Sequence, residues 1–197
     1  MEGWSGQGLL FLLSLVANTL SSLAGGGAGL LQLPVLIFLG LPFPIALATH
    51  KIASVALGVG ATLRHLRADP INWRFALFIL AAGLPGVWIG TQLILLVPEA
   101  WARAALGVLT LGLGAYSWRR PQLGRVQVLQ HTDRLGLLLG GGMLFAIGVL
   151  NGSLTSGTGL FVTIWLVRWF GLDYTRAVTY TLILVGMFWN GVGALTL

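Results

Sequence analysis

Long apolar stretches, interrupted by short polar or glycine-rich segments, make up almost the whole chain. About 20 apolar residues of helix cross the hydrocarbon core of a bilayer. Most stretches without Asp, Glu, Lys or Arg reach that length, and they cover residues 3–50, 75–98, 104–118, 135–167 and 177–197. The sequence lacks the alternation of polar and apolar residues that a membrane β-barrel requires. The pattern therefore predicts an all-α polytopic membrane protein.

Glycine, proline and charged positions divide these stretches into individual helices. We predict helices at 8–23, 30–40, 45–63, 74–97, 100–118, 135–150, 160–170 and 176–197. Gly40-Leu41-Pro42-Phe43-Pro44 predicts a turn, because each proline removes a backbone donor. Small residues fill two further breaks, at 25–29 and 151–159. Because the pieces that follow them are too short to cross a bilayer comfortably, each break is predicted to be the tip of a helical hairpin inside the membrane.

The two halves of the chain show the same order of elements. Gly27-Ala28-Gly29-Leu30-Leu31 aligns with Gly157-Thr158-Gly159-Leu160-Phe161, and in each half a short apolar piece, a turn and a helix follow. The polar stretch 119–134 separates the halves. We therefore expect a first membrane repeat at 1–126 and an incomplete second repeat at 127–197.

Basic residues are concentrated in three loops. Only 8% of the chain is charged, against about a quarter in soluble domains, yet the formal net charge is +6. Nine of the 11 Lys and Arg residues fall in 64–74, 119–134 and 168–176. When each hairpin counts as two passes, these loops share one side of the membrane, and the positive-inside rule makes that side cytoplasmic. We expect a bacterial inner membrane as the location.

This count gives five passes to a full repeat, and an odd number makes the two repeats inverted. Inverted repeats with broken helices that meet near the midplane are typical of transporters. Basic loops between apolar stretches also indicate that the partner is the lipid bilayer, with no nucleic acid.

Several chemistries are excluded by residue type. The chain has no cysteine, so neither disulfides nor thiolate sites can form. Its five acidic residues all fall in predicted loops and form no pair with metal-ligand spacing, and these are Glu2, Asp69, Glu99, Asp133 and Asp173. A cleaved signal peptide is not expected, because the first seven residues lack a basic region. We therefore expect no enzyme, no metal and no cofactor.

The two glycine-rich breaks are candidate anion sites. Free backbone N–H groups and the helix dipole at the start of the following helix attract negative charge. The candidate residues are Gly25, Gly26, Gly27 and Gly29 in the first break, with Ser156, Gly157, Thr158 and Gly159 in the second. The alternative is that these small residues only allow helices to pack closely.

Thr49-His50-Lys51 places polar and charged side chains inside an apolar helix. A lysine at the centre of a bilayer costs about 2.5 kcal/mol or more, so it usually faces a cavity or a partner. Lys51 then supplies charge for an anion, and His50 carries a proton. The alternative is that Lys51 extends to the membrane surface, since it follows Pro44 closely. Other polar residues of the second half, including Asn151 and Asn190, are interpreted as mostly structural.

Three motifs resemble those of the TauE/SafE-like sulfite exporter family. Leu23-Ala24-Gly25-Gly26-Gly27-Ala28-Gly29-Leu30-Leu31-Gln32-Leu33-Pro34 is similar to its first glycine-rich motif. Ala46-Leu47-Ala48-Thr49-His50-Lys51-Ile52 is similar to its Ala-Thr-Asn-Lys stretch, with histidine in place of asparagine. Asn151-Gly152-Ser153-Leu154-Thr155-Ser156-Gly157-Thr158-Gly159 resembles its second glycine-rich motif, with Ser156 in place of a proline.

The resemblance implies a permease or exporter for small sulfur-containing or organic anions, such as sulfite or sulfonates, coupled to an ion gradient. It also implies further helices after the second motif, because nothing here corresponds to residues 72–118 in the second half. That gap leaves an alternative, a non-transporting membrane subunit packed against a larger complex. Expected partners are the bilayer and a small anion, with a homodimer or another membrane protein as a possible association.

Overall fold

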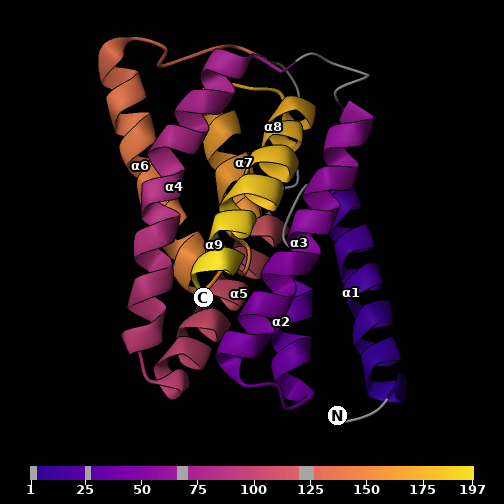
Figure 1. Ribbon diagram of the computed structural model, residues 1–197. Coiled ribbons are helices and arrows are strands. Elements are labelled where there is room, and N and C mark those ends of the chain that lie inside the picture. Colours follow the sequence, from indigo (N-terminus) through magenta and orange to yellow (C-terminus); the bar gives the residue numbers. More distant parts are fainter. Residues whose placement is uncertain (1–3, 25–27, 66–70, 120–126) are drawn as a thin grey trace.

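The computed structural model describes residues 4–24, 28–65, 71–119 and 127–197, and every element within these ranges is helical (Figure 1). The elements are α1 (Trp4–Ala24), α2 (Ala28–Phe38), α3 (Phe43–His65), α4 (Trp73–Leu96), α5 (Glu99–Arg119), α6 (Arg134–Ser153), α7 (Thr158–Arg168), α8 (Tyr174–Tyr180), the π-helix η1 (Thr181–Trp189) and α9 (Asn190–Thr196).

Caps and glycine turns set the ends of these helices. The Asn72 side chain accepts hydrogen bonds from the Arg74 and Phe75 backbone N–H groups at the start of α4, and Asp173 caps α8. Such side-chain acceptors satisfy donors that a helix start leaves free. Gly40 and Gly171 have φ of 88° and 69°, a left-handed conformation that favours glycine in the turns before α3 and α8.

Four stretches within the described residues are long and apolar enough to span a membrane. They are 43–64, 73–96, 134–153 and 174–196, the last formed by α8, η1 and α9 in one continuous rod. These spans confirm the predicted all-α polytopic membrane protein. The predicted boundaries differ from the observed ones by a few residues. One such difference matters for the site, because α6 continues to Ser153 and narrows the second break from 151–159 to 154–157.

The structure contains the two predicted hairpins, α1–α2 and α6–α7. Helices α2 and α7 have 11 residues each, or roughly 16 Å, about half of the hydrocarbon core. Figure 1 shows the first hairpin approaching from the end that carries the N-terminus and the second from the opposite end. Their tips therefore meet inside the bundle.

Glycines allow α4 and α6 to pack backbone against backbone. A methyl group on Gly86 or Gly90 of α4 would run into the backbone oxygens of Phe145 and Val149 on α6. In the reverse direction, Gly148 and Gly152 of α6 lie against backbone oxygens of α4. Small residues at such spacings are typical of closely packed membrane helices.

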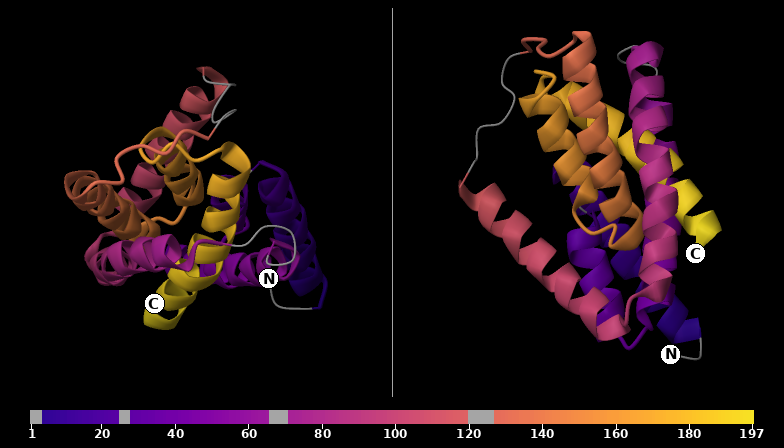
Figure 2. Two further views of the ribbon diagram at one scale, coloured as in Figure 1. Left: turned by 90° about the horizontal axis from the view of Figure 1, so that it is seen from above. Right: turned by 90° about the vertical axis from the view of Figure 1, so that its left-hand side faces the viewer.

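Helix α5 lies obliquely to the other helices, as the right-hand view of Figure 2 shows. Its first residue, Glu99, accepts a hydrogen bond from the Phe43 backbone N–H at 2.7 Å, which fastens the start of α5 to the start of α3. Farther along, Leu113 of α5 lies against Gly157 at the tip of the second hairpin. The oblique path therefore takes α5 from the turn before α3 past the tip of the second hairpin.

Candidate functional site

The break of the second hairpin is a short non-helical segment held by its own side chains. Thr155 has φ of 56°, an uncommon conformation for a β-branched residue, and Gly157 has φ of 69°. The Thr155 hydroxyl donates to the Asn151 backbone oxygen at 2.5 Å, and the Thr158 hydroxyl donates to the Thr155 oxygen at 2.7 Å. Strained backbone of this kind is concentrated at functional sites.

Gly29, at the start of α2, touches this break directly. A methyl group on Gly29 would lie 2.8 Å from Ser156 Cα and 2.9 Å from His50 Nε2. No side chain fits there, so the contact depends on glycine. The structure thus supports the packing interpretation for Gly29 and places it beside the second break. Gly25, Gly26 and Gly27 lie outside the described residues.

A cavity of about 40 Å³ lies between the two hairpin tips. Since one water needs about 10–15 Å³ by the same measure, the cavity has room for a ligand of a few heavy atoms. Its wall combines α3, both hairpins and η1, and it is lined by Ala28, Gly29, His50, Ser54, Leu57, Asn151, Thr155, Gly157, Thr158, Gly159, Thr181, Leu182, Val185, Gly186 and Asn190.

The wall formed by η1 has an unusual backbone. Nine residues adopt π-helical hydrogen bonding at the level of the cavity, and π-helical turns frequently occur at functional sites. Gly58 of α3 allows this wall to approach, because a methyl group there would lie 2.5 Å from the Met187 backbone nitrogen. Neither the π-helix nor this contact has a signal in the hydropathy pattern.

His50 is anchored from outside the cavity by a chain of amides. His50 Nδ1 lies 2.8 Å from Gln32 Oε1 on α2. The same oxygen accepts from Asn18 Nδ2 on α1 at 3.1 Å, and Gln32 Nε2 donates to the Ser14 hydroxyl at 2.6 Å. Helices α1 and α2 therefore fix one ring nitrogen of this cavity-lining residue, while the other, Nε2, lies beside Gly29 and 3.4 Å from the Ser54 hydroxyl.

Lys51 is fully buried and points to the second half of the chain. Its ammonium group donates to the Asn151 backbone oxygen at 2.9 Å, 100 residues away in sequence. It also lies against Gly193, where a methyl group would be 2.6 Å from Nζ. The lysine therefore does not extend to the membrane surface. It places its charge behind Asn151, at the carbonyl end of α6, where a cation is favoured.

Asn151 links the elements around the cavity through its side chain as well. Its Nδ2 donates to the Thr158 hydroxyl at 2.8 Å and lies 3.4 Å from Asn190 Oδ1 on α9. Its Oδ1 is buried without a hydrogen-bond partner. The sequence predicts a mostly structural role for Asn151 and Asn190, because a hydropathy pattern does not show that asparagines 39 residues apart line one cavity.

Five of the predicted site residues line this cavity, and these are Gly29, His50, Gly157, Thr158 and Gly159. Lys51 does not line it, but its ammonium group bonds to the backbone oxygen of the cavity-lining Asn151. Ser156 is buried at the tip, but its hydroxyl faces Thr110 of α5 at 3.5 Å. Thr49 points elsewhere, since its hydroxyl donates to the Ile45 oxygen and it lines a groove between α1 and α3.

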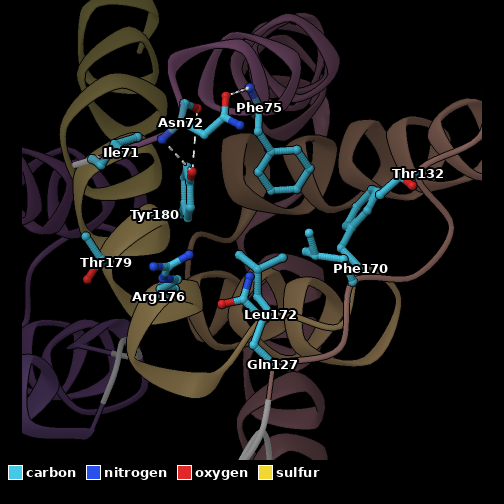
Figure 3. Close-up of a pocket in the computed structure, with 11 residues that line it drawn as sticks. Ile71, Asn72, Phe75, Gln127, Thr132, Phe170, Leu172, Arg176, Thr179 and Tyr180 are labelled. Atoms are coloured by element: carbon cyan, nitrogen blue, oxygen red, sulfur yellow. Dashed lines mark hydrogen bonds between the residues drawn. The ribbon is translucent and has the colours of Figure 1, made fainter. Parts of the chain in front are cut away.

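A second cavity, of about 230 Å³, lies at the end of the molecule that carries the basic loops (Figure 3). Figure 3 shows the Tyr180 hydroxyl directed at the backbone of Asn72, whose N–H donates to it at 3.0 Å. Arg176 supplies a guanidinium group to the same wall. Residues 179 and 180 line this outer cavity and residues 181 and 182 the central one, so a single rod borders both.

Comparison with known proteins agrees with this architecture. Residues 10–197 match the family described as "Sulfite exporter TauE/SafE". A probable membrane transporter protein of Haemophilus influenzae is 31% identical over 173 residues, which cover 87% of this chain and 66% of that protein. The probable membrane transporter protein ORF9 of Sinorhizobium is 28% identical over 94% of this chain and 69% of its own length.

The probable membrane transporter protein YfcA of Escherichia coli K12 is 27% identical over 90% of this chain and 65% of its own length. The chain thus spans roughly two thirds of the length of the curated relatives it matches. No solved structure matches. Because the family match covers nearly the whole chain and the relatives are named as transporters, this chain belongs to the TauE/SafE sulfite exporter family, a family of membrane permeases and not of enzymes.

Proposed function

We propose that the chain acts as a membrane permease or exporter for small sulfur-containing or organic anions of the sulfite and sulfonate type, coupled to an ion gradient. The observation that carries this proposal is the contact between the two hairpin tips, Gly29 against Ser156, beside a small cavity lined by both polar and apolar residues. Broken helices that meet around a cavity at the membrane midplane are a recurring substrate site in transporters.

The electrostatics of the central cavity suit a single negative charge. The first turn of α7, which includes Thr158 and Gly159, lines it, and a helix start carries partial positive charge and free N–H groups. The amino group of Lys51, cationic when protonated, lies behind Asn151. The sequence contains no acidic residue from 3 to 172 other than Asp69, Glu99 and Asp133, all of which lie outside the four spans. An anion in this cavity therefore has no buried carboxylate to repel it.

The proposed orientation places the loops 64–74, 119–134 and 168–176 in the cytoplasm and the turn between α2 and α3 on the other side. The two hairpins then enter from opposite faces, as inverted repeats at 1–126 and 127–197 require. We assign the outer cavity near Arg176 as the cytoplasmic entrance. Labelling of a single introduced cysteine in intact cells tests this orientation. The Leu41→Cys variant, in the turn between α2 and α3, should react with a reagent that stays outside the cell. Labelling of this position only from the cytoplasm would overturn the orientation.

Flux through reconstituted protein tests the function itself. Proteoliposomes that contain the chain should release trapped sulfite or methanesulfonate faster than empty liposomes, with a rate that changes when an imposed ion gradient is reversed. Liposomes containing Gly29→Leu provide the matched control, because that side chain would push the two tips apart. Equal rates for wild type, Gly29→Leu and empty liposomes would overturn the proposal.

A further inference from the structure

Two residues that line the central cavity carry hydrogen-bond acceptors, although an anion brings acceptors of its own. The first is Asn151 Oδ1, and its identity follows from its neighbours. The Thr158 hydroxyl gives its proton to the Thr155 backbone oxygen, so the Asn151 atom 2.8 Å from that hydroxyl must be a donor. That atom is Nδ2. The opposite atom is therefore the amide oxygen, which is fully buried, lacks a partner and belongs to a cavity-lining residue.

The second acceptor is His50 Nε2. The position of the proton on the imidazole ring follows from the orientation of two neighbouring side-chain amides, which a backbone oxygen fixes. Asn18 Nδ2 donates to the Ser14 oxygen at 2.8 Å and to Gln32 Oε1, which fixes both amide orientations. Gln32 Oε1 accepts only, so His50 Nδ1 must carry a proton to bond with it. In a neutral ring, Nε2 then presents a lone pair.

The surroundings of His50 favour the neutral ring. Its exposed fraction is 2%, and the sequence has no acidic residue from 3 to 68 or from 134 to 172 to balance an imidazolium. The charged side chain nearest to it in sequence is Lys51 on the same helix, and that charge is positive. A second unpaired cation in this interior would be expensive. The hydroxyl of Ser54 is 3.4 Å from Nε2, a long contact that leaves room for a better donor.

We propose that the site selects small anions that retain a hydrogen-bond donor, such as acid anions with one O–H group, over anions that have acceptors only. The negative oxygens face the start of α7, with Lys51 behind, and the O–H group donates to Asn151 Oδ1 or His50 Nε2. This inference rests on the proposed function and narrows its substrate class. A buried acceptor left unpaired by the wrong ligand is the usual basis of such discrimination.

Two matched probes isolate the donor. Methylphosphonate, held below its second pKa, and methanesulfonate are both tetrahedral monoanions with a methyl group, and they differ by one O–H group. Binding is measured by the shift in thermal unfolding of the detergent-solubilised chain with ligand concentration. We expect the methylphosphonate monoanion to bind at least about tenfold more tightly, which corresponds to about 1.4 kcal/mol.

Variants of the two acceptors locate the effect. In His50→Asn, the amide nitrogen keeps the bond to Gln32 and the Nε2 acceptor is lost, while Asn151→Leu removes the other acceptor. Each should reduce the preference for methylphosphonate several-fold and leave binding of methanesulfonate measurable. Ser153→Ala is the matched control, because its hydroxyl bonds to the Val149 oxygen within α6 and does not line the cavity. Its preference should equal that of wild type.

The outcomes separate the two proposals. If the wild-type chain neither binds nor transports any of the three anions (methylphosphonate, methanesulfonate and sulfite), the proposed function fails. If wild type binds both probes equally, the donor requirement fails and the proposed function stands. If both acceptor variants fold and keep the full preference for methylphosphonate, the O–H group of the ligand does not bond to either acceptor and the inference is wrong. Should both variants fail to fold, the wild-type comparison decides alone, since equal binding contradicts the inference and a tenfold preference supports it.

Discussion

The ammonium group of Lys51 lies 2.9 Å from the backbone oxygen of Asn151 and joins the middle of α3 to the broken end of α6. The bond connects the two halves of the chain at the level of the cavity. The same oxygen accepts from the Thr155 hydroxyl, so it retains a partner when the lysine is absent. Loss of the Lys51 ammonium group therefore does not leave this oxygen unpaired.

Replacement of Lys51 by Met separates charge from packing. Removing a buried cation in favour of an apolar side chain of similar length often leaves stability unchanged. We expect Lys51→Met to unfold within a few degrees of wild type and to lose most anion flux in proteoliposomes. Flux equal to wild type would remove Lys51 from the anion site.

Gly29→Ala tests the contact between the hairpin tips. The added methyl group would lie 2.8 Å from the Ser156 backbone, which forces a shift that costs about 1–3 kcal/mol by analogy with overpacked cores. Flux should fall along with the thermal unfolding temperature. Gly60→Ala on α3 is the control, because nothing lies within 4 Å of that position and alanine is the better helix former. If the two variants are equally stable, the tips do not touch as described.

The helices and their order could be predicted from hydropathy because lipid imposes both length and composition on a span. The hairpins were also predictable, since 11 apolar residues after a glycine-rich break are too short to cross. Pro34 and Pro85 lie inside α2 and α4 without ending them, in agreement with the predicted helices at 30–40 and 74–97. A sequence pattern does not reveal how neighbouring helices satisfy the backbone groups that a proline frees.

The site was predictable only in part, for a related reason. Glycine-rich motifs and a charge in an apolar helix point to Gly29, His50 and Lys51 from local sequence alone. The role of Gln32 depends on a histidine 18 residues away, and that of Asn190 on an asparagine 39 residues away. Such pairs are created by the tertiary fold. Thr49 illustrates the converse, because it neighbours His50 in sequence but faces a different groove.

Close packing of α4 and α6 gives a prediction about stability alone. Gly148→Ala would drive a methyl group into the backbone oxygen of Gly83, where no rotamer change relieves the clash. We expect a loss of about 1–3 kcal/mol, measured as a lower unfolding temperature in detergent. Gly142→Ala in the same helix meets nothing within 4 Å and should be neutral or slightly stabilising. Equal effects at the two positions would contradict the packing.

Glu99 gives a pH-dependent prediction outside the four spans. Hydrogen bonds from the Arg103 side chain at 2.7 Å and from the Phe43 backbone N–H lower the pKa of its carboxyl group below the usual value. A carboxyl group with a lowered pKa in the folded state stabilises the fold above its unfolded pKa, and this contribution disappears as the pH falls through the folded pKa. The unfolding temperature of wild type should therefore exceed that of Glu99→Ala at neutral pH, and the difference should shrink on acidification.

Because Glu99 is exposed, the difference in unfolding temperature should be small and weaken with added salt. A difference that stays constant from neutral to acidic pH would show that the carboxylate does not hold α5 to the start of α3.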